Sequence, residues 1–370
     1  MLTKRIRSFA AGFSRVVLAL TIACVLSSCP KPGAPVTVGF LYSDTPYDSS
    51  WTYGHEQARL ALLDSCHVKS APTVSVPGGA SPAEQKTALD KLVAKGCQLI
   101  FTTSYDFMPA TQIAAAENPG VYFMNCTDRG VGANLGTYNA RIYQADYLAG
   151  LLAGSLTESG KVGYVAPMPI LLQNVRINAF TLGVLERNPA ASVQVQWVGS
   201  WSDPRIERLA AQQLIDLGAD VLIHAQDTAT VNEVAEENGV LSFGSNTDMS
   251  GSGPTTYVSG PVYNWLPVYE EFAGMVYEGA WQAQEVFWGY EHAAVAMGPY
   301  SEAVTQEMAT LIDQRVEAFE REEYDLFTGP IYDNGGTLQV AESQRATDEQ
   351  LQTMDYLIQG VIELPPLEDQ

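Results

Sequence analysis

Short apolar runs alternate with helical segments along most of the chain, and they fall into two arrays. Each run is rich in β-branched or aromatic residues and is bounded by turn residues, a pattern that predicts buried strands. The predicted strands are residues 36–42, 72–76, 98–103 and 121–125 in the first array, and residues 161–166, 193–198, 220–224 and 240–243 in the second. Because strands that alternate with helices form parallel sheets, we expect an α/β protein with two doubly wound parallel-sheet lobes.

Capping residues mark several of the helices between these strands. Ser81, Pro82 and Glu84 supply an N-cap, a proline at the first helical position and a capping-box glutamate, and Gly96 is placed to end that helix. Asp203-Pro204 opens another helix in the second array. Later helices are predicted at about residues 264–289, 301–320 and 341–360.

Two further strands, near residues 133–138 and 255–259, interrupt the arrays where the chain is expected to cross between the lobes as hinge strands. The predicted division is a first lobe of residues 36–138 plus about 256–290, a second lobe of residues 139–255 plus about 291–336, and a C-terminal helix with an acidic tail at 337–370. Ligands of open α/β sheets bind at the carboxyl ends of the strands. The loops that face the cleft between the lobes are therefore the candidate binding site.

The N-terminus has the pattern of a bacterial lipoprotein signal peptide at residues 1–28, followed by a tether at 29–35. Four basic residues precede an apolar run at 16–26, which is too short to cross a hydrocarbon core of ~30 Å as a helix. Leu26-Ser27-Ser28-Cys29 resembles a lipobox, which implies lipidation of Cys29. A plain secretory leader and a lipobox at Cys24 are the alternatives. We expect a membrane-anchored lipoprotein in the periplasm or on the cell surface.

Loss of the signal peptide lowers the formal charge from −22 to −26, because residues 1–28 hold four basic and no acidic residues. Such a charge favours a soluble monomer and disfavours nucleic acid as a partner. Only the lipid is expected to contact the membrane, since no later apolar stretch is long enough to span it. Cys66, Cys97 and Cys126 remain, an odd number that cannot all pair, and none has metal-ligand spacing, so no metal or cofactor is expected.

The loop after the first strand carries a tryptophan at the start of a helix, where its flat ring suits a planar ligand or packs inside the lobe. Asp48-x-Ser50-Trp51-Thr52 resembles the Asp-x-Ser-Phe-Asn motif of the basic membrane protein (BMP) family, and Trp51-Thr52-Tyr53-Gly54-His55 resembles a subgroup of it with Trp-Thr-Tyr-x-His. Weaker matches follow in the family's order, including Tyr147-Leu148-Ala149-Gly150, Val162-Gly163-Tyr164-Val165-Ala166, Ile177-Asn178-Ala179-Phe180, Asp203-Pro204, Asn264-Trp265 and Phe327-Thr328-Gly329-Pro330-Ile331.

The resemblance implies a type I periplasmic-binding-protein fold and capture of a purine nucleoside or base for an ABC importer. The partners would be an ABC permease and its ATPase. Trp51 matches the family's base-stacking phenylalanine, and Trp201 is the candidate for a second stacking ring from the other lobe. Together they would sandwich the base, and burial of Trp201 in the core is the alternative. Tyr53 shares the subgroup motif with Trp51.

The resemblance is imperfect where the family reads the base and holds the ribose. Thr52 replaces the asparagine at the base edge, and Thr127, next to Asp128, replaces an acidic residue. Asn246 stands where the family has a ribose-binding aspartate, and the clamping lysine falls near Tyr263 or Asn264. We therefore expect a free base such as adenine rather than a nucleoside.

Further candidate contacts follow other strands of the two sheets. Ser104, Tyr105, Arg176 and Asp227 lie in loops or helix starts that are expected to face the cleft, although solvated loop residues would look the same. For His55, Arg59 and His224, packing or a salt bridge is the simpler expectation.

We do not expect an enzyme. The sequence lacks His-Glu-x-x-His and Gly-x-Ser-x-Gly, and residues 154–161 depart from the phosphate-loop spacing. A purine nucleosidase that uses Asp48, Asp106 or Asp227 is the alternative from the enzyme class. A sensor or adhesin with no transport role is a third possibility.

Overall fold

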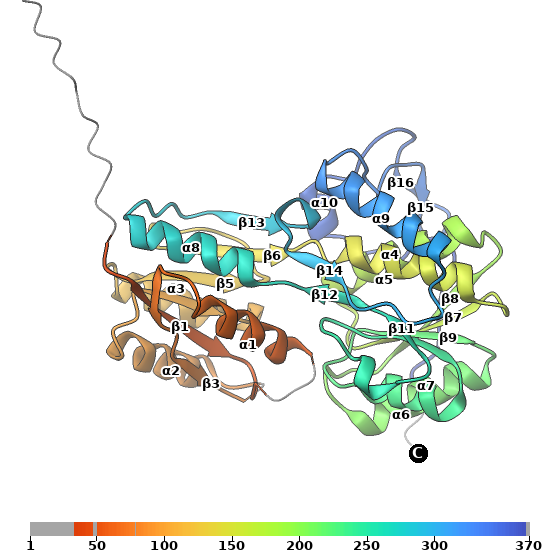
Figure 1. The fold of residues 1–370 in the computed structure, drawn as a ribbon, viewed down its shortest axis with the longest axis horizontal. Coiled ribbons are helices and arrows are strands. Elements are labelled where there is room, and N and C mark those ends of the chain that lie inside the picture. Colours follow the sequence, from red (N-terminus) through yellow and green to blue (C-terminus); the bar gives the residue numbers. More distant parts are fainter. Residues whose placement is uncertain (1–32, 47–49, 78, 368–370) are drawn as a thin grey trace, which may run out of the picture.

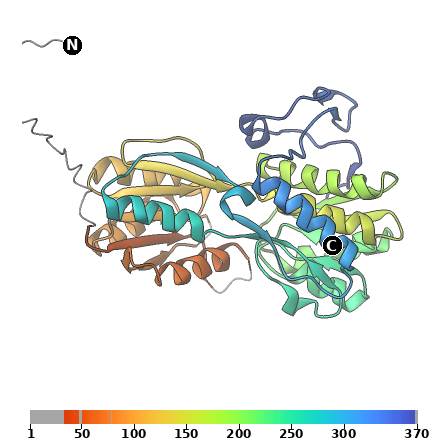
Figure 2. The same cartoon turned by 45° about the horizontal axis from the view of Figure 1, so that its top comes forward.

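The computed structural model describes residues 33–46, 50–77 and 79–367. Two α/β lobes lie side by side and are joined by a narrower central region (Figure 1), and they remain distinct when the molecule is turned (Figure 2). The fold class predicted from the sequence is thus confirmed. The predicted signal peptide, Cys29, Asp48 and Ser49 lie outside the described residues.

The first lobe is built on a seven-stranded sheet whose strands all pair in parallel. The order is β13-β6-β5-β4-β1-β2, and β3 also pairs with β1. Helices α1 and α8 pack on one face, and helices α2 and α3 pack on the other. The bounds are β1 Val36–Tyr42, α1 Trp51–Leu62, β2 Val68–Ser70, β3 Thr73–Ser75, α2 Pro82–Ala94, β4 Leu99–Thr102, α3 Met108–Glu117, β5 Tyr122–Cys126, β6 Leu135–Ala140, α8 Leu266–Glu278 and β13 Glu285–Trp288.

The second lobe has a six-stranded parallel sheet with the order β11-β10-β9-β7-β8-β17. Helices α4 and α5 pack on one face, and helices α6 and α7 pack on the other. The bounds are α4 Tyr143–Leu156, β7 Lys161–Ala166, α5 Leu171–Arg187, β8 Ser192–Trp197, α6 Pro204–Asp216, β9 Val221–His224, α7 Thr230–Asn238, β10 Leu241–Phe243, β11 Tyr257–Ser259, α9 Gln306–Glu320 and β17 Val361–Glu363.

The predicted capping residues act as expected. Ser81 and Glu84 form a complete capping box at the start of α2, and Gly96 follows the helix with a φ of 79°. Asp203 accepts hydrogen bonds from the backbone N–H groups of Arg205 and Ile206 at the start of α6. The polar turn residues of the sequence therefore fix these helix ends.

The predicted helix at residues 264–289 is wrong in its last third. Helix α8 ends at Glu278, and Gly279 follows in the left-handed conformation with a φ of 69°. Residues Glu285–Trp288 instead form β13, which pairs in parallel with β6 at the edge of the first sheet. The partner strand lies about 150 positions earlier in the chain, so local sequence carries no signal of this pairing.

The predicted C-terminal helix at residues 341–360 is also wrong. The β15–β16 hairpin (Ile331–Tyr332 and Leu338–Val340) precedes this region, which contains a single short helix, α10 (Asp348–Gln352), before β17 joins the second sheet beside β8. The side chain of Asn178 on α5 holds this segment: its Nδ2 donates to the Tyr356 carbonyl, and its Oδ1 accepts from the Ile358 N–H. Strand β11, which the predicted division places with the first lobe, pairs with β10 in the second. The other predicted lobe boundaries stay a prediction.

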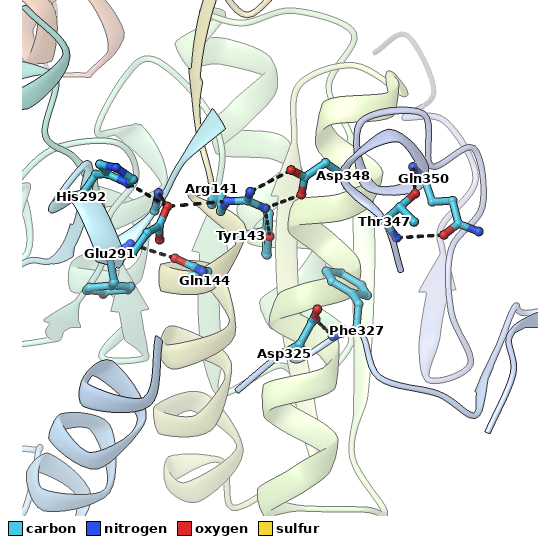
Figure 3. A network of polar contacts seen from close by, with 12 residues as sticks. Arg141, Tyr143, Gln144, Glu291, His292, Asp325, Phe327, Thr347, Asp348 and Gln350 are labelled. Atoms are coloured by element: carbon cyan, nitrogen blue, oxygen red, sulfur yellow. Dashed lines mark hydrogen bonds and ion pairs between the residues drawn. The ribbon is translucent and has the colours of Figure 1, made fainter. Parts of the chain in front are cut away.

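The chain crosses between the lobes after β6, around the antiparallel pair β12–β14 (Pro261–Tyr263 and Val295–Met297), and after β13. Arg141, at the first crossing, joins these segments to the C-terminal region (Figure 3). Its guanidinium donates to both carboxylate oxygens of Asp348 at 2.5 and 2.8 Å and lies 3.8 Å from Glu291. The guanidinium also lies over the ring of Phe287, 4.6 Å from its centroid. One side chain thus ties the hinge to α10.

Candidate functional site

A cavity of about 660 Å³ lies between the lobes at the carboxyl ends of their strands. Tyr53, which is 38% exposed on α1, does not line it. Asn264 does not line it either, and its amide donates to the Ala293 carbonyl at 2.8 Å. The structure brings the other predicted contacts together in the cavity wall: Trp51, Thr52, Ser104, Tyr105, Arg176, Trp201, Asp227 and Asn246. Ligand contact by any of these residues stays a prediction.

Trp51 is the first residue of α1, and its indole is fixed in place by polar and aromatic contacts. Its Nε1–H donates to the Thr103 carbonyl at 2.7 Å. Its ring meets the rings of His55 and Tyr263 edge to face, at centroid distances of 4.8 and 5.3 Å. A half-buried indole held at this position forms a rigid flat part of the cavity wall.

Behind Trp51 lies a stack of rings that reaches into the hinge. Trp265 is sandwiched between His55 at 4.7 Å and Tyr263 at 4.7 Å, with interplanar angles of 9° and 11°. His55 is fully buried, and its Nδ1 lies 2.5 Å from the Tyr269 hydroxyl. Burial holds the pKa of His55 well below its ordinary value of 6.5, so the ring is neutral. The expectation of packing for His55 is therefore met.

Trp201 and Tyr105 approach from opposite lobes. The Trp201 carbonyl accepts the backbone N–H of Asp227 at 2.8 Å, which fixes the loop after β8 to the loop after β9. Burial raises the pKa of the Tyr105 hydroxyl, Asp106 adds to the rise, and a hydrogen-bonding contact with the Trp201 side chain opposes it. Tyr105, 45% exposed, and Trp201 thus line the same cavity from different lobes. A base sandwiched between Trp51 and Trp201 stays a prediction.

Arg176 is buried and already committed to protein partners. Its Nε and Nη2 donate to the two carboxylate oxygens of Asp146 at 2.9 and 3.1 Å, and its Nη1 donates to Asn246 Oδ1 at 3.1 Å. Burial alone would lower the pKa of Arg176, but the charge of Asp146 more than offsets this and raises it. The guanidinium is therefore a charged and rigid part of the wall.

Asn246 carries this network across the cleft. Because arginine only donates, the amide oxygen of Asn246 faces Arg176 and its NH₂ group faces Ser50, whose Oγ accepts at 2.8 Å. Ser50 precedes α1 in the first lobe, whereas Asn246 follows β10 in the second. Both residues are buried, so this is a water-shielded hydrogen bond between the lobes.

The charges of the wall favour neutral or cationic ligands. Asp44, Asp106 and Asp227 line the cavity, and the one basic residue in its described lining, Arg176, is paired with Asp146. An anionic ligand would meet these carboxylates with no unpaired cation to offset them. Uncharged molecules with N–H or O–H donors suit such a wall.

Several lining residues were missed as contacts in the sequence. Thr127, which lines the cavity with a φ of 62°, and Tyr263 had been noted only as motif positions. The others are Ser43, Asp44, Gly79, Leu172, Gln173, Ser200 and Ser202. Ser43 and Asp44 directly follow β1, and Gln173 lies one helical turn before Arg176. Arg176 was selected because it lies at a helix start that follows a strand, and the same criterion would have selected Gln173.

The described residues offer little sign of other chemistry. No group of His, Cys, Asp and Glu within them is arranged to hold a metal ion. Cys66, Cys97 and Cys126 are all free thiols, the first exposed and the other two buried. His224 is buried between the Asn232 side chain and the Gln226 N–H, as expected for a residue that ends a strand. In the same part of the chain, no helix combines the length and apolar character that a bilayer span requires.

Comparison with known proteins places this chain in a family. The model of the Bmp family, described as ABC transporter substrate-binding protein PnrA-like, matches residues 35–325. A purine-binding protein of Brucella abortus (strain 2308) is 32% identical over 346 residues, which cover 94% of this chain and 98% of that protein. A protein of Haloferax volcanii assigned as an ABC transporter glucose-binding protein is 30% identical over 306 residues, covering 82% of this chain and 77% of that protein.

Solved structures support the fold. An ABC transporter solute-binding protein from Conexibacter woesei superposes with a TM-score of 0.68 at 21% identity, covering 78% of this chain and 97% of that chain. The two parallel sheets and the interlobe cavity agree with the type I periplasmic-binding-protein fold. Since the family match spans most of the chain, this protein belongs to the Bmp family of PnrA-like ABC transporter substrate-binding proteins.

Proposed function

We propose that this protein captures a free purine base, such as adenine, between its lobes and delivers it to an ABC permease and its ATPase. The observation that carries the proposal is the composition of the cavity wall. It combines the indoles of Trp51 and Trp201 with an acidic lining and an Arg176–Asn246 pair that is already bonded to the protein. The Brucella abortus relative named for purine binding supports the same ligand class.

Two indoles in one cavity suit a flat heterocycle. Stacking of a base on an aromatic side chain contributes about 1–3 kcal/mol per base. Because every purine presents a π-face, stacking supplies affinity without distinguishing one base from another.

The bonds of Asn246 argue for a base without its sugar. Its amide oxygen already accepts from Arg176 and its NH₂ group already donates to Ser50, and a neutral amide is a weaker acceptor for ribose hydroxyls than a carboxylate. The BMP resemblance places an aspartate and a lysine in the ribose clamp, whereas Asn246 stands at the first place here and Tyr263 or Asn264 at the second. Loss of hydrogen bonds to charged groups costs a nucleoside about 1.5–3 kcal/mol each. The acidic lining also disfavours nucleotides.

We further propose that Cys29 carries a lipid that holds the receptor, as a monomer, near its permease at the outer face of the membrane. The Leu26-Ser27-Ser28-Cys29 sequence supports this proposal. Mass spectrometry of the membrane-extracted protein would show a diacylglyceryl modification on Cys29, and a Cys29→Ala variant would be released into the soluble fraction.

Calorimetry with purified protein tests the ligand. We expect adenine to bind more tightly than adenosine, and AMP and glucose to bind weakly or not at all. Trp51→Ala removes the stacking ring and should weaken adenine binding by 10-fold or more, at ~1.4 kcal/mol per decade. Trp281→Ala is the matched control, because Trp281 packs on Tyr122 outside the cavity.

Glucose binding in the absence of purine binding would refute the proposal and favour the ligand named for the Haloferax volcanii relative. Unchanged adenine affinity in Trp51→Ala would refute the stacking role alone. Incubation with adenosine tests the nucleosidase alternative, since release of free base at enzymatic rates would identify an enzyme. Native mass spectrometry of the protein as purified would reveal any ligand that it retains.

A further inference from the structure

Gln173 combines burial, a place in the cavity wall and an unused hydrogen-bonding group. It is the third residue of α5, is 1% exposed and lines the interlobe cavity. Within the described part of the chain, no donor lies within hydrogen-bonding distance of its Oε1. A buried amide oxygen without a partner is costly, so a site that retains one is suited to a ligand that supplies the missing donor.

The backbone of Gln173 and its neighbour Arg176 are held by hydrogen bonds. The backbone N–H of Gln173 donates to the Ile170 carbonyl at 2.9 Å in the first turn of α5. Arg176 follows three positions later on the same helix face and is locked by Asp146 and Asn246. Arg176 therefore has partners of its own, and the Gln173 side chain is not among them.

A buried amide oxygen without a hydrogen-bond partner does not by itself indicate a ligand contact. Gln194 and Gln226 also bury amide oxygens that lack a partner among the described residues, but neither lines the cavity. Asn178, another buried amide on α5, has both of its polar atoms bonded to the C-terminal segment. Gln173 differs from these residues because it combines an unpaired amide oxygen with a place in the lining of the cavity.

We propose that Gln173 determines specificity by reading the polar edge of the bound purine. Its Oε1 accepts from the exocyclic amine at position 6, and its Nε2 donates to the adjacent ring nitrogen, as in the bidentate pairing of glutamine with adenine N6 and N7. The proposal rests on the purine-binding function proposed above. Stacking on Trp51 and Trp201 then gives affinity, and Gln173 distinguishes one purine from another.

A pair of ligands that differ only at position 6 tests this role. Adenine carries the amine and unsubstituted purine lacks it. Gln173→Met keeps the size of the side chain and removes both hydrogen bonds to adenine but only one to purine. We expect the affinity for adenine to fall by roughly 10- to 100-fold and the affinity for purine by roughly 3- to 10-fold, so that the preference for adenine becomes smaller.

Gln194→Met is the matched control, because it removes a buried, unpaired amide in the same lobe away from the cavity. It should leave both affinities unchanged. Both methionine variants should melt at or above the wild-type temperature, since each removes an unpaired buried polar group.

Gln173→Glu provides a second variant with the opposite expected effect on selectivity. The carboxylate still accepts from the adenine amine but cannot donate to a ring nitrogen, so the preference for adenine over purine should rise. An unchanged adenine-to-purine ratio in both variants would overturn the assignment of Gln173 while leaving the receptor function intact. Failure of the wild-type protein to bind any purine would instead overturn the proposed function.

Discussion

His224 is a buried side chain whose hydrogen bonds define its protonation. Its Nδ1 accepts the Gln226 N–H at 3.2 Å, so its Nε2 carries the proton and donates to Asn232 Oδ1 at 2.9 Å. Burial lowers the pKa of His224 from 6.5 to about 4, although the Asn232 hydrogen bond opposes the shift. On acidification, His224 therefore binds a proton near pH 6.5 in the unfolded chain but only near pH 4 in the folded protein.

The free energy of unfolding should accordingly fall on acidification between pH 6.5 and about 4, by ~1.4 kcal/mol per pH unit for this residue. The glutamine of His224→Gln can still donate to Asn232 but does not titrate. The free energy of unfolding of this variant should therefore fall less steeply with pH than that of the wild type, by ~1.4 kcal/mol per pH unit. Chemical denaturation at several pH values measures the difference. His55 stays in both proteins and contributes equally, so parallel curves would show that His224 carries no such linkage.

For individual residues, the sequence predicts which side chains follow the strand ends but not which hydrogen-bond partners these side chains have. Trp51 and Trp201 could be selected because their position relative to a strand is a local property. Arg176 was selected in the same way, yet Asp146 and Asn246 occupy its donors. These partners lie 30 and 70 positions away, so only the fold shows that Arg176 is committed.

Helices α4 and α5 pack so closely that their backbones touch at glycines. A methyl group on Gly150 of α4 would lie 2.1 Å from the Phe180 carbonyl oxygen of α5, and one on Gly183 would lie 2.2 Å from that of Tyr147. Gly150→Ala should therefore force the helices apart and destabilise the protein by about 1–3 kcal/mol. Thermal or urea unfolding measures this loss.

Gly274→Ala in α8 is the matched control, since its methyl group would meet its nearest atom, in His67, at an ordinary 3.6 Å. Alanine is the better helix former, so this variant should gain roughly 0.5–1 kcal/mol. Equal effects of the two substitutions would contradict the close backbone contact.

Elements with strong local signals were predictable, and elements defined by distant partners were not. Strands β1 and β7 were predicted at the residues where they occur, because both are short buried runs between turn residues. Strand β13 was predicted as helix and β17 as part of the acidic tail, because each exists only through pairing with β6 or β8. Both are edge strands whose partners lie far away in the chain.

Across the whole molecule, the cavity, the hinge and the lobe contacts form one connected system. The Trp51 ring lies against Tyr263 in β12, so a ligand stacked on Trp51 would press on the hinge itself. The hydrogen bond from Asn246 to Ser50 then links the lobes beside the same ring. We expect a closed form favoured by this bond to bind ligand more tightly, because affinity scales with the population that is competent to bind.

Ser50→Ala tests this lobe-to-lobe bond with a minimal change. Its hydroxyl does not cap α1, so the helix should remain intact. A neutral hydrogen bond contributes about 0.5–1.5 kcal/mol. The affinities for adenine and for unsubstituted purine should therefore both fall by the same factor, roughly 3- to 10-fold. Small-angle scattering should show a larger radius of gyration for the ligand-free variant than for the wild type. Ser70→Ala is the control, because it alters a serine of the same lobe away from the cavity, and it should change neither the ligand affinities nor the radius of gyration. Loss of affinity for adenine alone would assign Ser50 to base reading, whereas an equal loss for both ligands separates lobe closure from the selectivity that Gln173 controls.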